Sequence, residues 1–163
     1  MVETQVRNRH RLKKKVIREL NNKLNNTFSS NFDFEKFTID SAMVGNSEVF
    51  FFDNELLALN INNEPFLSIR GILKFQPTRR FVTVDMGAVK FVTNGADVMS
   101  PGIVDADLNL LVADIVWVRD EQNKKPLAIG AALMTGPLMI ESKSDKAVKT
   151  LHYIGDHLWQ LKD

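Results

Sequence analysis

The segment Val82–Ile103 constrains the fold more than any other part of the chain, because it predicts a strand, a short helix and a second strand in close succession. Val82–Val84 is β-branched, which is typical of a strand. Asp85 is placed to cap the following helix, where its carboxylate can accept hydrogen bonds from free backbone N–H groups. Gly95 can adopt the left-handed conformation that often ends a helix. A second strand, Ala96–Met99, is predicted directly after it.

The side chains of this short helix are expected to divide between the core and the solvent. Val89, Phe91 and Val92 are apolar and are predicted to pack on one side, which leaves Lys90 pointing elsewhere. After the second strand, the turn residues Ser100–Gly102 redirect the chain.

The start of this helix has two interpretations. Gly87 and Ala88 leave the backbone N–H groups of the first turn uncovered by bulky side chains. A helix N-terminus carries unpaired donors and about half a positive charge, which suits a phosphate, and Lys90 adds a full charge one turn further on. The same small residues are compatible with a junction that serves packing only. The spacing alone leaves both interpretations open.

The residues themselves resemble the signature of the PUA domain, an RNA-binding module named for pseudouridine synthases and archaeosine transglycosylases. The resemblance is carried by Asp85–Val92, Gly95–Met99, Pro101-Gly102, His152-Tyr153 and Leu158-Trp159. As a whole, this string is most similar to the translation-associated family of the protein called multiple copies in T-cell malignancy, with its shorter archaeal relatives. The similarity is strong around the helix start and thin before Leu67.

The resemblance implies a small α+β domain, residues 1–78, followed by a mostly β PUA pseudo-barrel with short helices, residues 79–163. It implies a non-catalytic protein that binds tRNA or ribosomal RNA in translation initiation, reinitiation or ribosome recycling. The ribosomal small subunit and an initiation-factor-like protein are the further partners that it suggests. The expected RNA-binding residues are Met86, Gly87, Ala88, Lys90, Met99, Ser100, Pro101 and Gly102.

Two alternative functions stay open at this point. The chain could be an RNA-recognition accessory module that acts in trans for a tRNA or rRNA modification enzyme. It could also be a protein-interaction adaptor in which the RNA surface has decayed. Retention of Gly87, Lys90 and Gly102 argues against the adaptor.

Composition narrows the class of protein. Hydrophobic residues make up 44% and charged residues 25% of the chain, which is typical of a soluble globular protein. Cysteine is absent, which excludes disulfides, thiolate catalysis and cysteine-based zinc sites. No apolar run is long enough to span a bilayer, and the charged start does not resemble a secretory signal. We therefore expect a cytoplasmic protein with no membrane partner.

The charge is unevenly distributed. The net charge is +1, yet residues 1–30 hold eight lysines and arginines against two acidic residues. Leucine and valine recur every four residues from Leu12 to Leu24, which predicts an amphipathic helix from about Arg9 to Asn26, after a loose start. The basic residues, among them Arg11 and Lys14, form either a solvated outer face or a contact surface for nucleic acid or an acidic partner.

A small antiparallel sheet is predicted after this helix. Short β-branched or aromatic runs predict strands at Lys36–Ile39, Glu48–Phe52, Leu56–Ile61 and Phe66–Ile69. The pairs Asp53-Asn54 and Asn62-Asn63 separate neighbouring strands and are typical of turns. The phenylalanines Phe28, Phe32, Phe34 and Phe37 could stack on bases but are expected to be core residues that dock the helix on the sheet. This pattern indicates an α+β unit.

The two halves are joined by the basic segment Arg70–Arg80, which Gly71 and Pro77 punctuate. It is expected to be either a charged linker or an RNA contact surface. Its basic residues are Arg70, Lys74, Arg79 and Arg80.

The last part of the chain predicts further strands. Asp114–Val118 and Leu127–Met134 are expected to form a hairpin around the polar loop 120–126, and Leu108–Val112 to form a strand or a helical turn. Gly130 predicts a bulge or a close backbone approach. Ser142–Leu151 is predicted to be a helix capped by Ser142 or Ser144 after a turn at Gly136-Pro137, and a last strand is predicted through Leu158 and Trp159 after a turn at Gly155-Asp156.

No set of residues in the sequence predicts catalysis. His152 and His157 are close in sequence, with Asp156 between them, but a third metal ligand is not evident. The chain lacks a phosphate-binding loop, a nucleophile elbow and a Rossmann glycine pattern. The sequence therefore predicts a binding protein without a metal or cofactor.

Overall fold

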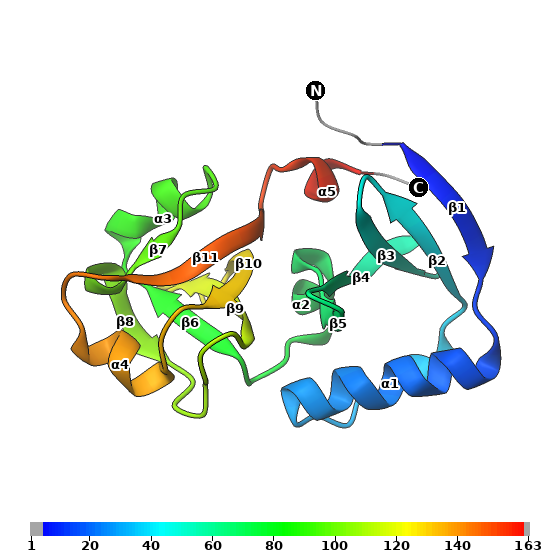
Figure 1. Ribbon diagram of the computed structural model, residues 1–163, viewed down its shortest axis with the longest axis horizontal. Coiled ribbons are helices and arrows are strands. Elements are labelled where there is room, and N and C mark those ends of the chain that lie inside the picture. The colour runs from blue at the N-terminus through cyan, green and yellow to red at the C-terminus, as the bar shows by residue number, and fades with distance from the viewer. Residues whose placement is uncertain (1–4, 162–163) are drawn as a thin grey trace. The chain divides into compact units, whose positions relative to one another are not determined.

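The computed structural model describes residues 5–161, which divide into two compact units. The first comprises the residues up to Pro77 together with Gln160 and Leu161, and the second comprises Thr78–Trp159. Figure 1 shows the elements of both units. None of the helices in the described part of the chain combines the length and apolarity needed to cross a membrane.

The first unit is an antiparallel sheet of five strands in the order β1-β2-β3-β4-β5, with helices packed against it. The strands are β1 Val6–Arg11, β2 Ile39–Val44, β3 Ser47–Phe52, β4 Glu55–Ile61 and β5 Glu64–Leu67. The helices are α1 Lys14–Phe28, the 3₁₀ turn η1 Phe34–Lys36 and α2 Ile69–Phe75. The predicted α+β arrangement of helix on antiparallel sheet is confirmed.

The amphipathic helix was predicted with the wrong start. Arg9 and Arg11 belong to strand β1, and α1 begins only at Lys14. Strand β1 lies at the edge of the sheet and is almost entirely exposed, so it lacks the apolar alternation by which a strand is recognised. The buried stripe of α1 is Ile17, Leu20, Leu24 and Phe28. Val16, expected in that stripe, is 41% exposed.

Two hairpin turns of this sheet follow the sequence closely. Asp53 and Asn54 have φ values of 49° and 73°, and Asn62 and Asn63 have φ values of 52° and 67°. Positive φ at both central residues is the type I′ arrangement that matches the twist of a two-residue hairpin. Both predicted turns are confirmed.

The aromatic residues around α1 form a core, as predicted. Phe28 and Phe34 are fully buried, whereas Phe32 and Phe37 are half-buried. The Phe34 ring lies 4.8 Å from the ring of Phe75 in an edge-on arrangement. Phe75 belongs to helix α2, which occupies most of the segment predicted as a linker. The linker prediction was therefore wrong for Arg70–Phe75, because this part of the segment is helical and its Phe75 packs in the aromatic cluster.

The second unit is built on a curled sheet of six strands in the order β7-β11-β10-β9-β6-β8. The strands are β6 Phe81–Val84, β7 Val98–Met99, β8 Ile103–Ala106, β9 Ile115–Asp120, β10 Pro126–Ala132 and β11 Lys146–Tyr153. The helices are α3 Met86–Val92, the 3₁₀ turn η2 Ser100–Gly102, α4 Gly136–Glu141 and α5 His157–Gln160. Strand β6 pairs in parallel with β9, and the remaining pairs are antiparallel. This mixed sheet with short helices confirms the predicted fold of the second half.

Several elements after Ile103 differ from the predictions. Strand β8 was missed, and Leu108–Val112 forms turns and not a strand. The helix predicted over 142–151 is wrong: α4 begins at Gly136 with Thr135 as its cap, and β11 begins at Lys146. The buried residues Ala147 and Val148 lie in a strand that pairs with both β7 and β10, and this pairing overrides the helical preference.

The predicted last strand is also wrong, because Leu158 and Trp159 lie in the short helix α5. The N–H of Trp159 donates to Asp156 Oδ1 at 2.8 Å, so an aspartate begins the helix where sequence reasoning saw only a turn.

Gly130 confirms the expected irregularity in β10. The register between β10 and β11 shifts between Ile129 and Gly130. A Cβ at this position would overlap the backbone carbonyl oxygen of Lys149. The predicted bulge and the predicted close approach therefore occur at the same residue.

Candidate nucleic-acid interface

The junction between β6 and α3 has the geometry that the sequence predicts. The Asp85 side chain caps the helix, with Oδ1 accepting from the Ala88 N–H at 2.9 Å. The backbone N–H of Asp85 donates to the carbonyl oxygen of Gly102 at 2.8 Å, which ties the helix start to the turn η2. A Cβ at Gly102 would lie 3.2 Å from the Cβ of Ala88. Small residues at both positions therefore let α3 and η2 come close together.

A groove of about 530 Å³ lies along this junction. This volume is within the usual range for pockets that hold small molecules. The groove is lined by Asp85, Gly87, Ala88, Phe91, Val92, Ala96, Asp97, Val98, Met99, Pro101 and Gly102. Five of the eight residues predicted to bind RNA, namely Gly87, Ala88, Met99, Pro101 and Gly102, are therefore brought together in its wall.

The other three predicted residues lie outside the lining. Met86 and Lys90 are exposed on α3. Ser100 is buried, and its hydroxyl donates to Ser142 Oγ at 3.2 Å and accepts from the Asp145 N–H at 3.2 Å. The role of Ser100 in this structure is thus to hold η2 against the chain that leads into β11.

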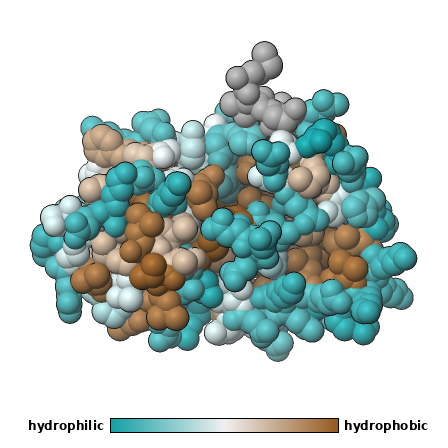
Figure 2. Space-filling view, in the orientation of Figure 1, coloured by the Kyte–Doolittle hydropathy of each residue, from teal (hydrophilic) through white to brown (hydrophobic). Residues whose placement is uncertain are grey.

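Phe91 is the main residue of the groove that sequence reasoning missed. It was predicted to pack inside, but 56% of its surface is exposed. A helix of this length buries one side only, and that side is occupied by Ala88 and Val92, four residues apart. The four-residue spacing of Ala88 and Val92 is compatible with an exposed Phe91, but the fold was needed to show that this pair faces the sheet. Figure 2 shows that hydrophobic residues, in brown, reach the surface of this unit among hydrophilic ones.

The charges around the groove disfavour a phosphate at the helix start. The Ala88 N–H is already bound by Asp85, whose carboxylate lies at that end of the helix. Asp97 also lines the groove, where it accepts from the Thr150 N–H at 3.0 Å and lies 3.3 Å from Lys146 Nζ. Lys90 lies towards the other end of α3, with its Nζ 5.1 Å from the centre of the Phe91 ring. The charge of Lys90 is therefore outside the groove lining, whereas the carboxylates of Asp85 and Asp97 are within it and only Asp97 is paired, with Lys146.

Strand β11 supports the turn that follows α3. Gly95 has a φ of +90°, and a Cβ there would lie 2.8 Å from the Tyr153 ring. Next to Tyr153, the buried Asp156 accepts from His152 Nδ1 at 2.7 Å and from the Tyr153 N–H at 2.9 Å. Burial alone would raise the pKa of Asp156. The hydrogen bond and charge of His152, together with the N–H groups of Trp159 and Tyr153, have the larger effect, so the pKa of Asp156 is lowered.

The Asp156 cluster predicts a pH-dependent stability. Asp156→Asn is expected to lower the free energy of unfolding by about 2 kcal/mol at neutral pH, because a buried acceptor for three donors is altered. An aspartate with a lowered pKa in the folded state contributes stability that is present above its unfolded pKa and is lost as pH falls through the folded pKa. The difference between wild type and variant should therefore shrink in acid. Urea unfolding across a pH series measures it, with the exposed Asp145→Asn as control; a constant difference would contradict the assignment.

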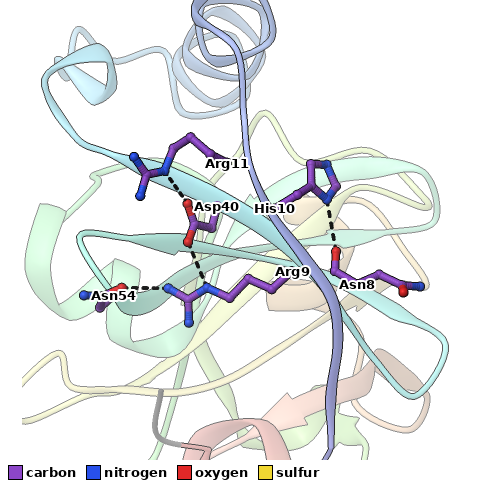
Figure 3. A network of polar contacts seen from close by, with 6 residues as sticks. All are labelled: Asn8, Arg9, His10, Arg11, Asp40 and Asn54. Carbon is purple, nitrogen blue, oxygen red and sulfur yellow. Dashed lines mark hydrogen bonds and ion pairs between the residues drawn. The ribbon is translucent and has the colours of Figure 1, made fainter.

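The predicted basic contacts are distributed over both units. In the first unit, Asp40 holds two arginines of β1, with Arg11 Nε at 2.6 Å and Arg9 Nε at 2.8 Å (Figure 3). The hydrogen bond from Arg11 lowers the pKa of Asp40, partial burial opposes this, and Arg9 lowers it further. Arg9 also donates to Asn54 Oδ1 at 2.7 Å. This network ties the edge strand β1 to the sheet.

The other predicted basic residues differ in their surroundings. Lys14 is exposed in the first turn of α1, which contains no acidic residue. Lys74 lies 3.5 Å from Glu55. In the second unit, Arg79 is exposed, whereas Arg80 is half-buried and donates to the Ile115 carbonyl oxygen at 3.2 Å. Within residues 5–161, no group of His, Asp or Glu side chains is arranged to hold a metal ion.

Comparison with known proteins identifies the second unit. The family model of the PUA domain matches residues 80–154, which include the whole groove. A crystal structure of a hypothetical protein from Pyrococcus horikoshii superposes with a TM-score of 0.85 at 32% sequence identity. The superposition covers 95% of this chain and 99% of that one, so the resemblance includes both units.

Two relatives extend the comparison. An uncharacterized protein of Methanocaldococcus jannaschii is 40% identical over 97% of this chain and 99% of its own length. Translation machinery-associated protein 20 of Saccharomyces cerevisiae is 31% identical over 67% of this chain, and the alignment spans 64% of the yeast protein. The chain belongs to the PUA-domain family whose homologues include translation machinery-associated protein 20 and the malignant T-cell-amplified sequence proteins.

Proposed function

We propose that this protein binds tRNA or ribosomal RNA without catalysing a reaction, and that it acts in translation initiation, reinitiation or ribosome recycling. The observation that carries the proposal is the groove at the α3–η2 junction, inside the segment that matches the PUA domain. The translation part of the proposal is supported by the names of the yeast relatives. A cytoplasmic location and contact with the ribosomal small subunit belong to the same proposal.

The proposed RNA-binding surface consists of the groove and its rim. Gly87 and Ala88 on one wall and Met99, Pro101 and Gly102 on the other contact the nucleotide. Met86 and Lys90 are exposed on α3 and contact the RNA at the rim, where Lys90 lies near the backbone phosphates. Ser100 positions η2 through its buried hydrogen bonds.

A second set of contacts is proposed for the basic residues. Three consecutive lysines, Lys13–Lys15, are exposed at the start of α1, where the helix dipole is itself positive and no acidic side chain compensates. Hydrophilic residues cover this helix in Figure 2. Such an uncompensated charge suits RNA phosphates, with Lys14 as a contact in the first unit. Arg11, which is ion-paired with Asp40 but has a side chain that is 65% exposed, is proposed as a second contact there. Arg70, Lys74, Arg79 and Arg80 are proposed as further contacts.

The two parts of the chain are proposed to fold as separate domains, residues 1–78 and 79–163, with the RNA groove in the second. An initiation-factor-like protein is proposed as a partner of the first. Purification of the full chain from cells tests the cellular part of this proposal: ribosomal small subunits should co-purify. Consistent recovery of an RNA-modification enzyme in place of ribosomal subunits would contradict it.

Lys90→Glu tests the proposed surface. Replacing an attractive charge near the phosphates by a repulsive one is expected to weaken binding to structured RNA about tenfold, and to do so for all RNA sequences. The measurement is fluorescence anisotropy of the full chain with labelled tRNA and with a ribosomal RNA hairpin, at fixed salt. Lys36→Glu is the control, because it makes the same change in net charge at an exposed residue of the first unit. Equal affinities of Lys90→Glu and wild type would exclude this surface.

A further inference from the structure

We propose that the groove takes an unpaired nucleotide, with Asp85 Oδ2 accepting a hydrogen bond from its base or ribose and Phe91 stacking on its base, while the phosphates remain outside. This inference rests on the proposed RNA-binding function and names the part of the RNA that the groove recognises. It gives Asp85 a role beyond helix capping, and it places Phe91, which was predicted from the sequence to pack in the core, at the binding surface.

Asp85 has a free hydrogen-bond acceptor at the groove. Its Oδ1 is occupied by the Ala88 N–H, whereas no side chain or backbone group of residues 5–161 donates to Oδ2. The residue is half-buried and lines the groove. A carboxylate oxygen can only accept, so it selects a ligand group that carries a hydrogen.

The charged side chains that line the groove are both acidic. Asp85 and Asp97 both line the groove, and the phosphate of a nucleic acid would be repelled by both carboxylates. Lys146 partly compensates Asp97, at 3.3 Å, and no described cation lies within ion-pair distance of Asp85. The nucleotide must therefore enter with its uncharged parts first. The donors available to Asp85 are the amino groups of cytosine, adenine and guanine, the ring N–H groups of uracil and guanine, and the hydroxyls of ribose.

Phe91 presents an exposed aromatic ring at the groove. More than half of its surface is exposed on the groove side of α3, although burying an aromatic ring is strongly favourable. Within residues 5–161, Lys90 is its only described aromatic or cationic neighbour, with its Nζ over one face of the ring, so a base would stack on the opposite face. Stacking of an unpaired base on an exposed ring is a common mode of RNA recognition. A base in a duplex is already stacked and cannot make this contact.

Asp85→Asn separates this proposal from phosphate binding by the sign of the effect. Asparagine caps helices as well as aspartate, so α3 should be preserved, but one acceptor oxygen is replaced by an amino group. If Asp85 accepts from the nucleotide, Asp85→Asn weakens binding of single-stranded RNA about tenfold. If a phosphate lies there, removal of the negative charge strengthens binding. Asp33→Asn, which removes the same charge from an exposed position in the first unit, is the control.

The ligand arms of this experiment identify the donor. The full chain is titrated with labelled oligo(C), oligo(A), oligo(U) and oligo(dC) under the same salt conditions. If the donor is a base amino group, Asp85→Asn lowers the affinity for oligo(C) and oligo(dC) but not for oligo(U). If the donor is the ribose hydroxyl, the variant lowers the affinity for all three RNA oligomers but not for oligo(dC). If the donor is the ring N–H of uracil, the variant lowers the affinity for oligo(U) alone. An unchanged or increased affinity for all four would overturn the assignment of Asp85.

Phe91→Ala tests the stacking half of the proposal. Loss of the ring is expected to lower the affinity for single-stranded RNA about tenfold and to leave the affinity for a fully paired duplex unchanged. Leu111→Ala is the control, because Leu111 is an apolar residue that is 63% exposed and lies away from the groove. Its loop lies beside the start of β6, whereas α3 follows the end of that strand. An equal loss of affinity for single-stranded RNA and for the duplex would overturn the stacking role of Phe91. Absence of any RNA binding by the wild-type chain would instead refute the proposed function.

Discussion

Phe34→Ala is expected to lower the free energy of unfolding of the first unit by about 4 kcal/mol, the typical loss for removing a buried phenylalanine ring. Phe34 is fully buried, and its ring contacts those of Phe32, Phe52 and Phe75, from three different segments. Its removal would leave a cavity that β3 and α2 cannot both close, because neighbouring backbone hydrogen bonds fix their positions.

The expected loss can be measured separately for the first unit. Both tryptophans, Trp117 and Trp159, lie after Pro77, so tryptophan fluorescence reports on the second unit while far-UV circular dichroism reports on both. Urea unfolding followed by both signals should show the destabilisation in the circular dichroism transition. Leu73→Ala, at an exposed residue of α2, is the control with little expected effect. A loss below about 1 kcal/mol for Phe34→Ala would contradict its place at the centre of this core.

Gly71→Ala is expected to destabilise the first unit by about 3 kcal/mol, against the usual direction for such a change. In the interior of a helix, alanine normally stabilises by about 1 kcal/mol relative to glycine. Here a Cβ would overlap the backbone carbonyl oxygen of Leu57, so α2 would have to move away from β4. The overlap with rigid backbone outweighs the gain in helix propensity.

The same urea experiment measures this substitution, with Lys74→Ala on α2 as the control. Lys74 is exposed and lies 3.5 Å from Glu55, a surface ion pair that is expected to contribute little. Stabilisation by Gly71→Ala would show that α2 does not pack as closely on β4 as the structure has it.

The features that the sequence predicted correctly are those with local causes. The Asp85 cap, the turns at Asp53-Asn54 and Asn62-Asn63 and the bulge at Gly130 each depend on a few adjacent residues. The conformational restrictions of aspartate, asparagine and glycine are the same in any fold, and they can therefore be read from the chain.

The elements that were missed depend on contacts between distant residues. Strand β1 is held by pairing with β2 and by Asp40, about thirty residues away, and nothing in its own polar sequence indicates a strand. Strand β11 lies between β7 and β10 and was mistaken for a helix. In both cases the partner decides the conformation, so a local pattern is not sufficient.

The candidate site shows both situations. The motif placed Gly87 and Ala88 at a helix start and Pro101 and Gly102 in a turn, and the structure puts all four in one groove. The position of Phe91 followed from which side of α3 meets the sheet, and this required the fold. The same information changed the expected chemistry, from a phosphate at the helix start to an uncharged part of the nucleotide beside Asp85.

The most direct test of RNA binding at the groove is photo-crosslinking of the purified full chain to bound tRNA and ribosomal RNA, followed by mass spectrometry of the crosslinked peptides. The account predicts crosslinks concentrated within residues 86–102, with Phe91 and Met99 as the expected attachment sites. It also predicts their loss when unlabelled RNA competes. Crosslinks confined to other parts of the chain, with none between 86 and 102, would contradict the assignment of this groove as the RNA-binding site.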